Sequence, residues 1–180
     1  MKRLFDLFFS IPMLIILSPL FFLSFLIALI DTTSTGIFTQ KRIGQYGKPF
    51  TIYKVRTLHV KTGKVSTIGN FFRKYKIDEL PQLWNVLIGN MSMVGPRPDL
   101  AGYYDILEGE NRKILDLKPG ITSEASLKYF NEEELLNQQK NPLQYNDTVI
   151  FPDKVTMNLD YYYHHSLSGD FKILWKTFFR

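Results

Sequence analysis

The chain of 180 residues is long enough for one ordinary domain with a substantial hydrophobic core. Hydrophobic residues make up 45% of the sequence and aromatic residues 15%, which excludes a disordered protein. The absence of cysteine excludes a disulfide framework, a thiolate zinc site and a thiol nucleophile, and it fits a reducing compartment.

The net charge of +5 is distributed unevenly along the chain. No acidic residue lies between Asp31 and Asp78, whereas this interval contains many lysines and arginines. Such a basic block repels itself unless an anion lies beside it or water solvates it as an ordinary basic face. The candidate anions are a phosphorylated substrate, an anionic lipid surface and nucleic acid.

The segment from Leu7 to Ile30 contains no charged residue. As a helix it would be about 36 Å long, which is enough to cross a bilayer core of about 30 Å. The segment is too long for the apolar core of a secretory signal peptide, and no small-residue cleavage pattern follows it. We therefore expect a helix that enters the membrane.

Two features bear on the topology of this helix. Lys2 and Arg3 precede it and the basic block follows it, so both flanks favour the cytoplasmic side. Ser18-Pro19 lies in its middle, where proline removes a backbone donor and the serine hydroxyl can cap a carbonyl that becomes free. A helix that breaks at Ser18-Pro19 and returns satisfies both flanks, and a plain span is the alternative.

Residues 37–56 are predicted to form a β-hairpin, because two runs of β-branched and aromatic residues flank a turn at 44–49. In the second strand, Ile52, Lys54 and Arg56 share one face by the strand period of two. Two cations on one strand face could bind a phosphate, and the alternative is that this face is exposed to solvent.

A helix is predicted over residues 77–88. Asp78 is expected to be its N-cap, Pro81 falls in its first turn, and Gly89 closes it. The Gly-Pro-Arg-Pro sequence at 95–98 then predicts a stiff loop.

Three further segments follow. Residues 100–115 are predicted to be helical, and residues 132–153 are predicted to be a helix followed by a variable loop. Residues 171–179 interleave aromatic and basic residues, which is typical of a helix in a membrane interface and also of a core-packing terminal helix. Taken together, the segments predict an α+β protein that is mostly helical.

The strongest candidates for catalytic residues are Asp78 and Glu79. Carboxylates at the start of a helix are common and need no function. Here, however, Arg73 precedes them, Arg97 follows in the proline-rich loop, and Lys54 comes from the hairpin. A carboxylate among cations suits phosphoryl chemistry, because it can attack phosphorus while the cations hold the phosphate oxygens.

One long motif resembles a known family. The string Lys76-Ile-Asp-Glu-Leu-Pro-Gln-Leu-Trp-Asn-Val-Leu-Ile-Gly-Asn-Met-Ser-Met-Val-Gly-Pro-Arg-Pro98 is similar to the signature of the bacterial sugar transferases, which are small monotopic phosphoglycosyl transferases. The hairpin, the Ser18-Pro19 pair, the Lys118-Pro-Gly-Ile-Thr122 string and the segment from Asp160 to Lys172 resemble further elements of this family.

The resemblance implies a re-entrant membrane helix hairpin at 1–30 and a catalytic domain at 31–180 with a small β-hairpin and interfacial amphipathic helices. It further implies a location at the bacterial inner membrane, with the catalytic domain facing the cytoplasm. Asp78 would attack a UDP-sugar and release UMP, and a polyprenyl phosphate such as undecaprenyl phosphate would then accept the sugar phosphate.

The resemblance also implies roles for further residues and partners. Asp78 and Glu79 would bind Mg²⁺ as a cofactor. The positions expected around the substrates are Lys54, Arg73, Arg97 and Asp170, with Asp160 as a weaker match and Arg56 suggested by its strand face. Downstream glycosyltransferases are possible partners, and no nucleic acid is expected.

The sequence departs from the family pattern at two places. Asn90 follows Gly89 where an aspartate is common, and the run at 123–130 lacks an arginine for which Lys128 is a potential substitute. These departures leave open which sugar nucleotide is used.

Two rival functions are a membrane-tethered nucleic-acid binder and a catalytically silent scaffold of a glycan assembly complex. The first predicts strongly salt-dependent binding, and the second would tolerate loss of Asp78.

Overall fold

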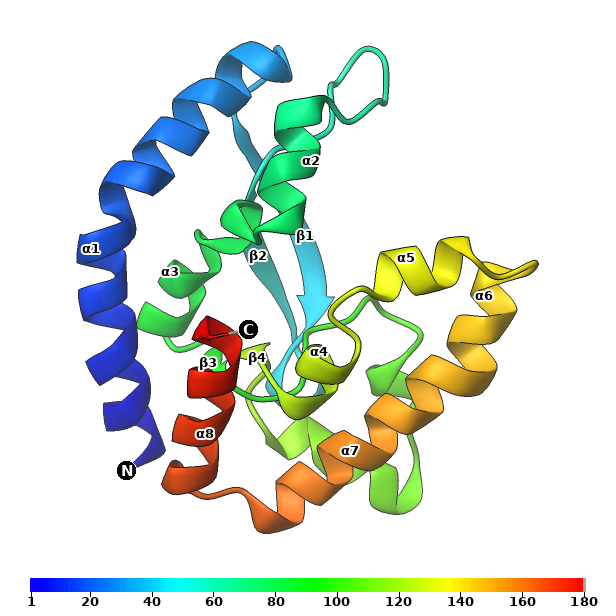
Figure 1. Ribbon diagram of the computed structural model, residues 1–180. Coiled ribbons are helices and arrows are strands. Elements are labelled where there is room, and N and C mark those ends of the chain that lie inside the picture. Colours follow the sequence, from blue (N-terminus) through cyan, green and yellow to red (C-terminus); the bar gives the residue numbers. More distant parts are fainter. Residues whose placement is uncertain (180) are drawn as a thin grey trace. The chain divides into compact units, whose positions relative to one another are not determined.

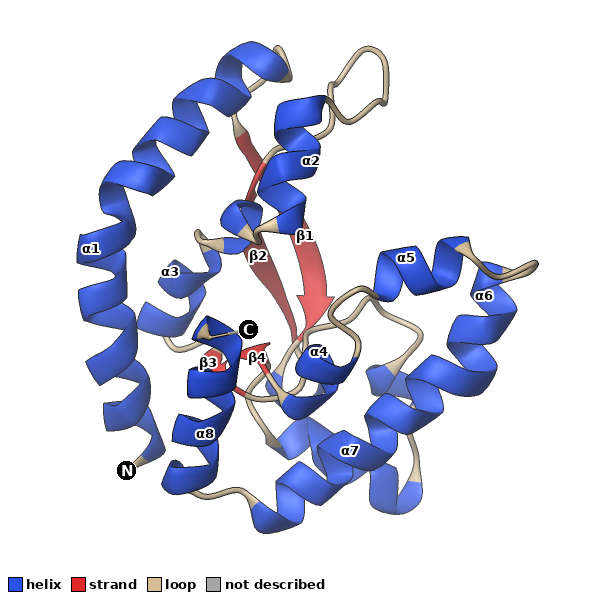
Figure 2. Cartoon of the chain, in the orientation of Figure 1, coloured by secondary structure: helices blue, strands red, loops and turns tan. Residues whose placement is uncertain are grey.

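The computed structural model describes residues 1–179 and divides the chain into two compact units. Unit 1 comprises Met1–Arg42 and Pro49–Met91, and unit 2 comprises Ile43–Lys48 and the chain from Ser92 onward. Figures 1 and 2 show a mostly helical chain with short strands, as the sequence predicts.

Unit 1 contains the long N-terminal helix, a hairpin and three short helical segments. Its elements are α1 (Lys2–Asp31), β1 (Ile37–Ile43), β2 (Pro49–Val55), α2 (Thr67–Lys74), the 3-10 helix η2 (Ile77–Glu79) and α3 (Gln82–Leu87). Its hydrophobic core joins Ala28 of α1, Val55 of β2 and Phe72 of α2. Burial of these three residues therefore packs α1 against the hairpin and α2.

Helix α1 is long and apolar enough to cross a membrane. It turns its small and polar residues toward unit 1, since Asp6, Ser10, Ser24 and Ala28 are its buried residues. Its large apolar side chains point outward, and Leu4, for example, is 72% exposed. This arrangement is the reverse of a helix that packs its apolar face into a soluble core.

The expected break at Ser18-Pro19 is wrong for this structure, because α1 is helical without interruption from Lys2 to Asp31 and is visibly bowed (Figure 1). Pro19 cannot donate to the carbonyl of Ile15, but the Ser18 hydroxyl donates to that oxygen at 2.8 Å. The predicted role of Ser18 as a carbonyl cap is therefore confirmed. Since the lost bond is replaced, the helix bends without ending.

The predicted hairpin is confirmed, with β1 and β2 as a two-stranded sheet. Both faces of β2 carry buried residues, because Ile52 and Val55 lie on opposite faces and are each almost fully buried. The side chain of Asn85 in α3 secures β2: its amide donates to Thr51 O at 2.7 Å, and its Oδ1 accepts from Tyr53 N at 3.3 Å.

The predicted helix over residues 77–88 is divided into η2 and α3. Asp78 lies within η2 and is not an N-cap, so that expectation is wrong. Lys76, which precedes η2, adopts the left-handed conformation with φ of 56°, and this sharp turn prevents a regular α-helical start. Gly89 follows α3 with φ of 89°, which confirms it as the residue that ends the helix.

Unit 2 contains two short strands and a series of helices. Its elements are η1 (Gln45–Gly47), β3 (Ser92–Val94), η3 (Tyr104–Ile106), η4 (Gly109–Asp116), β4 (Gly120–Thr122), α4 (Glu124–Lys128), α5 (Glu132–Asn137), α6 (Pro142–Tyr145), the π-helix η5 (Asn146–Ile150), α7 (Phe151–His164) and α8 (Leu167–Phe178). Its core contains Tyr104, Ile114, Leu115 and Val155.

The strands β3 and β4 pair in parallel, with Ser92 opposite Gly120. This sheet was not foreseen from the sequence. Gly95 and Gly120 allow the two chains to approach closely, because a Cβ atom on Gly120 would lie 2.2 Å from Gly95 N. Pro96 O also accepts from Gly120 N at 2.8 Å, so the predicted stiff loop at 95–98 is held against β4.

Two other helix predictions in unit 2 need correction. Residues 100–115 form 3-10 turns in place of an α-helix, because Gly102 and Gly109 adopt positive φ and interrupt it. The variable loop expected before Asp153 is helical, and Pro152 falls in the first turn of α7, where proline is tolerated.

The predicted C-terminal helix is present as α8. Ile173 and Leu174 are buried, whereas Phe171, Trp175 and Phe178 are exposed. The helix thus has one face in the core of unit 2 and a separate aromatic face at the surface.

The contacts of Asn85 predict a large loss of stability in Asn85→Ala. The substitution leaves two partly buried backbone groups of β2 without their side-chain partner, so we expect a loss of about 3 kcal/mol, or roughly 6–12 °C in melting temperature. Thermal unfolding in detergent measures this change. Asn90→Ala at an exposed position is the matched control and should change the melting temperature little; equal effects of the two variants would contradict the structural role of Asn85.

Candidate active site

The buried carboxylate of Asp78 lies within a cluster of charged residues in unit 1. Asp78 is only 7% exposed, although it sits in a short 3-10 turn. The turn is held by the backbone bonds Glu79 N to Lys76 O at 3.1 Å and Leu80 N to Ile77 O at 3.3 Å. The local backbone therefore directs this side chain inward and keeps Glu79 beside it.

Cations from two other elements lie near the carboxylates of Asp78 and Glu79. The ammonium of Lys54, on β2, pairs with Glu79 Oε1 at 2.9 Å, and both side chains are largely buried. Arg73 lies in the last turn of α2, where its Nε donates to Thr57 Oγ1 at 2.9 Å. The structure therefore brings Lys54, Arg73, Asp78 and Glu79 together from residues that are up to 25 positions apart.

Burial raises the pKa of Asp78 to about 6, because the charged form loses its hydration. This value includes the neighbouring charge of Glu79, which also raises the pKa, and the charges of Lys54, Lys76 and Arg73, which lower it in part. The carboxyl group thus remains ionised at neutral pH but holds its proton more strongly than an ordinary aspartate. Such a group is a stronger base and nucleophile than one in water.

One oxygen of Asp78 is left without a donor. Among residues 1–179, no group donates a hydrogen bond to the buried Oδ1 atom. A buried carboxylate oxygen without a partner is costly, and it is commonly explained by a ligand or an ion that completes the site. No cluster of three or more histidine, aspartate or glutamate side chains able to hold a metal occurs within this described range.

Arg56 lies just beyond β2, and its side chain contacts β1. Its guanidinium lies over the ring of Phe38 at 5.5 Å, and its Nη2 donates weakly to Ile37 O at 3.4 Å. These contacts secure the start of β1. A role of Arg56 in substrate binding stays a prediction.

Arg97 and Asp170 belong to unit 2. Arg97 is half-buried in the loop that follows β3, and Asp170 is fully buried in the first turn of α8. Asp170 Oδ1 accepts a short 2.6 Å hydrogen bond from the Tyr161 hydroxyl, which also lies 3.3 Å from Val94 O. Tyr161 therefore links α7 to α8 and to the strand before Arg97, and the sequence analysis missed it.

Asp160, the neighbour of Tyr161, lies on a solvent-exposed side of α7. Its side chain is 70% exposed, and Oδ1 lies 2.9 Å from His164 Nδ1. The turn of about 100° between successive residues of a helix would have distinguished the two residues only if the buried face of α7 had been known. A substrate contact by Asp160 stays a prediction.

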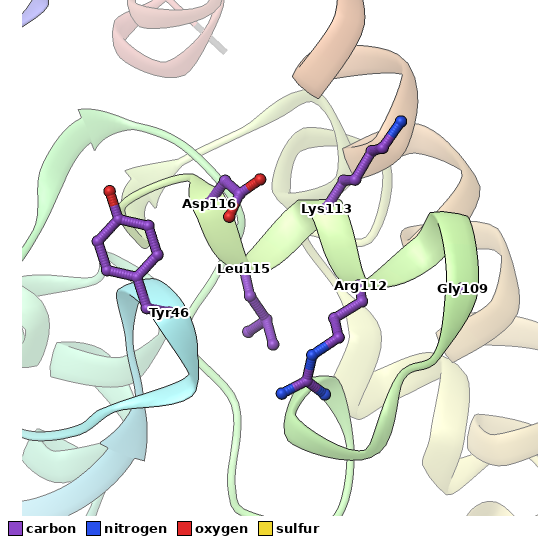
Figure 3. Close-up of a pocket in the computed structure, with 6 residues that line it drawn as sticks. All are labelled: Tyr46, Gly109, Arg112, Lys113, Leu115 and Asp116. Atoms are coloured by element: carbon purple, nitrogen blue, oxygen red, sulfur yellow. The ribbon is translucent and has the colours of Figure 1, made fainter.

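Unit 2 also has an open pocket of about 370 Å³ (Figure 3). It is lined by Tyr46, Gly109, Arg112, Lys113, Leu115 and Asp116. Figure 3 shows the two cationic side chains pointing to different sides. Arg112 donates to the carbonyl oxygens of Asp105 and Leu107, and Lys113 pairs with Glu110 at 2.9 Å. These internal bonds explain the two cations, and we assign no phosphate chemistry to the pocket.

The raised pKa predicts that Asp78→Asn stabilises the protein in a pH-dependent manner. The folded protein binds the Asp78 proton more tightly than the unfolded chain, so its stability falls as pH rises from about 4 through 6. Asparagine resembles the neutral acid and avoids this loss. We expect no difference at pH 4 and a gain of roughly 3 kcal/mol at pH 8, which unfolding in the presence of a metal chelator measures.

The control for this experiment is Glu108→Gln, which removes an exposed carboxylate from unit 2. This variant should show a much smaller change over the same pH range. If Asp78→Asn is equally or less stable than the wild type at pH 8, burial of the ionised carboxylate does not destabilise the protein.

The chain is similar to known proteins along its full length. The family model described as "Bacterial sugar transferase" matches residues 1–180. A protein of Bacillus subtilis (strain 168), provisionally named as an undecaprenyl-phosphate N-acetylgalactosaminyl 1-phosphate transferase, is 38% identical over 121 residues, which cover 61% of this chain and 68% of that protein.

Two longer alignments also match sugar-phosphate transferases. A UDP-glucose:undecaprenyl-phosphate glucose-1-phosphate transferase of Escherichia coli (strain K12) is 31% identical over 197 residues, which cover 100% of this chain and 40% of that protein. A protein of the same name from Caulobacter vibrioides is 30% identical over 195 residues, which cover 98% of this chain and 67% of that protein. Because the family match extends over the whole sequence, the chain belongs to the bacterial sugar transferase family.

Proposed function

We propose that this protein is a phosphoglycosyl transferase that moves a sugar-1-phosphate from a UDP-sugar to a polyprenyl phosphate such as undecaprenyl phosphate. The observation that carries the proposal is the buried carboxylate of Asp78, with its raised pKa, among Lys54, Arg73 and Lys76. The names of the relatives from Escherichia coli and Caulobacter agree with this type of transfer. The products are a polyprenyl-diphosphosugar and UMP.

In the first step, an oxygen of Asp78 attacks the β-phosphorus of the UDP-sugar. A bond forms between this oxygen and phosphorus, and the bond from phosphorus to the bridging oxygen of the diphosphate breaks, so that UMP leaves with both bonding electrons. Arg73 and Lys54 neutralise charge on the phosphate oxygens. Because Asp78 is shielded from water, its oxygen attacks without first losing a full hydration shell.

In the second step, an oxygen of the polyprenyl phosphate attacks the same phosphorus. The acyl-phosphate bond to Asp78 breaks, the carboxylate is restored, and the polyprenyl-diphosphosugar is released. Two successive displacements at one phosphorus allow the water-soluble donor and the lipid acceptor to react in turn at a single nucleophile.

Asp78 and Glu79 are suited to hold Mg²⁺ in this site. The unpartnered Oδ1 of Asp78 and the adjacent carboxylate of Glu79 provide the hard oxygen ligands that this ion prefers, and a diphosphate would supply more. When bound, the ion would neutralise charge on the diphosphate leaving group. Glu79 also pairs with Lys54, so the protein balances this carboxylate by its own cation as well.

The exposed apolar surfaces support a membrane location. The outward face of α1 is apolar, and the short helix α2 exposes Ile68 and Phe71 beside Lys74. The aromatic face of α8 has the same character and fits a membrane interface. We propose that residues 1–30 enter one leaflet of the bacterial inner membrane from the cytoplasm and that residues 31–180 form the catalytic domain on that side.

The donor sugar and later partners are separate questions. The relatives named above point to a panel of UDP-glucose and UDP-N-acetylgalactosamine as first donors to test. Asn90, where an aspartate is common, is exposed. Lys128 pairs with Asp153 at 2.7 Å, so this cation is at least partly engaged within unit 2. Downstream glycosyltransferases would use the lipid-linked product.

Asp78→Asn should abolish turnover, because the amide cannot form the covalent intermediate. The measurement is UMP release in detergent with undecaprenyl phosphate. In the absence of the lipid acceptor, the wild type should carry a sugar-phosphate adduct on Asp78 that intact-mass analysis detects. Glu108→Gln, at an exposed site, should retain activity. An adduct on another residue, or turnover by Asp78→Asn, would assign the nucleophile elsewhere, and a silent scaffold would tolerate the change.

Arg97→Lys should lose at least tenfold in kcat/KM, although the charge is retained. The loop at 95–98 is fixed to β4, so the guanidinium fork loses little freedom when it binds a phosphate, and lysine provides only a point charge. Steady-state kinetics with saturating acceptor test this expectation. Lys172→Arg on α8 is the control, because it exchanges one cation for another at an exposed position of unit 2 and should retain activity. Wild-type rates for Arg97→Lys would show that the fork does not bind substrate.

A further inference from the structure

Arg3 makes an unusual pair of contacts within unit 1. Its Nη1 donates to Val86 O and its Nη2 donates to Leu87 O, each at 2.5 Å. These are carbonyl groups at the C-terminal end of α3, more than eighty residues away in the sequence. The side chain is partly buried, so the contacts are shielded from water.

The C-terminal end of α3 is a favourable place for a guanidinium. The last carbonyls of a helix have no partner within the helix, and the helix dipole places partial negative charge there. Val86 O accepts from Gly89 N as well, whereas Leu87 O accepts from the Arg3 guanidinium. A fork of two parallel donors on two successive carbonyls fixes both direction and position.

Helix α3 directly follows the turn that carries Asp78 and is hydrogen-bonded to it. Leu83 N donates to Leu80 O at 3.1 Å, and Leu80 N donates to Ile77 O at 3.3 Å. A displacement of α3 would therefore be transmitted to Asp78. Since α1 also packs along α3, the N-terminal end of the membrane helix and the catalytic turn are connected through one short helix (Figure 1).

The other end of α1 is fixed to the same unit. Asp31 Oδ2 accepts from the Ser66 hydroxyl at 2.7 Å, and Ser66 is the N-cap of α2, the helix whose last turn carries Arg73. Both ends of α1 are thus bonded to helices that border the charged cluster.

We propose that Arg3 is a positioning residue that fastens the N-terminal end of α1 to α3 and thereby fixes the turn of Asp78. The sequence alone accounts for Arg3 as one of two charges that keep the N-terminus in the cytoplasm. In that role its position would matter little, and Lys2 would be equivalent. In the proposed role, only a guanidinium at position 3 suffices.

The test moves the guanidinium by one residue without changing the charge. The double variant Arg3→Leu with Leu4→Arg keeps the composition of the flank but turns the cation by about 100° to the exposed face of α1. Hydrogen exchange of the protein in detergent, read by mass spectrometry, should show about tenfold faster exchange in residues 82–91, since charge-assisted bonds are lost. Exchange in α7, in unit 2, should not change.

Three controls separate the two roles of Arg3. Leu4→Arg alone and Lys2→Ala should leave exchange in residues 82–91 within twofold of the wild type. Arg3→Lys, which retains the charge and one donor, should give an intermediate increase and serves if the double variant does not fold. Wild-type exchange in the double variant or in Arg3→Lys, or an equal effect of Lys2→Ala, would overturn the proposal.

The catalytic consequence rests on the proposed transferase function and has a separate readout. Because Arg3 does not belong to the charged cluster, the double variant should lower kcat for UMP release at least fivefold while KM for the UDP-sugar stays within twofold. Faster exchange without a change in kcat would overturn the link to Asp78. Absence of UMP release in the wild type would instead refute the proposed function and leave the exchange result intact.

Discussion

The side chain of Asn85 joins α3 to β2 through hydrogen bonds to Thr51 O and Tyr53 N. Its position decides the arrangement around Asp78, because β2 carries Lys54 and α3 follows the turn that carries Asp78 and Glu79. With α3 fixed on β2, the Lys54–Glu79 pair forms at 2.9 Å in a largely buried place. A buried amide with all these bonds made is stabilising, whereas the same amide without them would be costly. The charged cluster therefore depends on one uncharged side chain.

The burial of Asp78 has an energetic cost and a chemical use. Loss of hydration raises its pKa to about 6, and three nearby cations limit the rise so that the group remains ionised at neutral pH. Cations alone would lower the pKa and make the carboxylate a weaker nucleophile, and burial alone would favour its protonated form. The combination gives an ionised but poorly solvated carboxylate. Helix α1 supports the same unit, because its small and polar residues are buried against it and both of its ends are hydrogen-bonded to it.

Much of this protein was determined by local sequence. The long uncharged segment predicted α1, the turn residues at 44–49 predicted the hairpin, and Gly89 marked the end of α3. The prediction that Ser18 caps a carbonyl near Pro19 holds, because both residues lie within one helical turn. The resemblance of residues 76–98 to a family signature also predicted the family that the full-length match shows. These features depend on residues close together in the chain, and local physical chemistry is sufficient for them.

Only the tertiary structure decided the features that depend on distant residues. With Lys76 left-handed, the start of the expected helix at 77–88 is a 3-10 turn, and with Gly102 and Gly109 at positive φ the expected helix at 100–115 is replaced by 3-10 turns. The pairing of β3 with β4 needs two glycines that are 25 positions apart to meet. Tyr161, and not its neighbour Asp160, faces Asp170, because the packing of α7 determines which side of the helix is buried. Arg3 looked like a charge at the chain terminus, and its use as a cap of α3 follows from packing alone. Sequence periodicity predicts which residues share a face, but the partner of that face is set by long-range contacts.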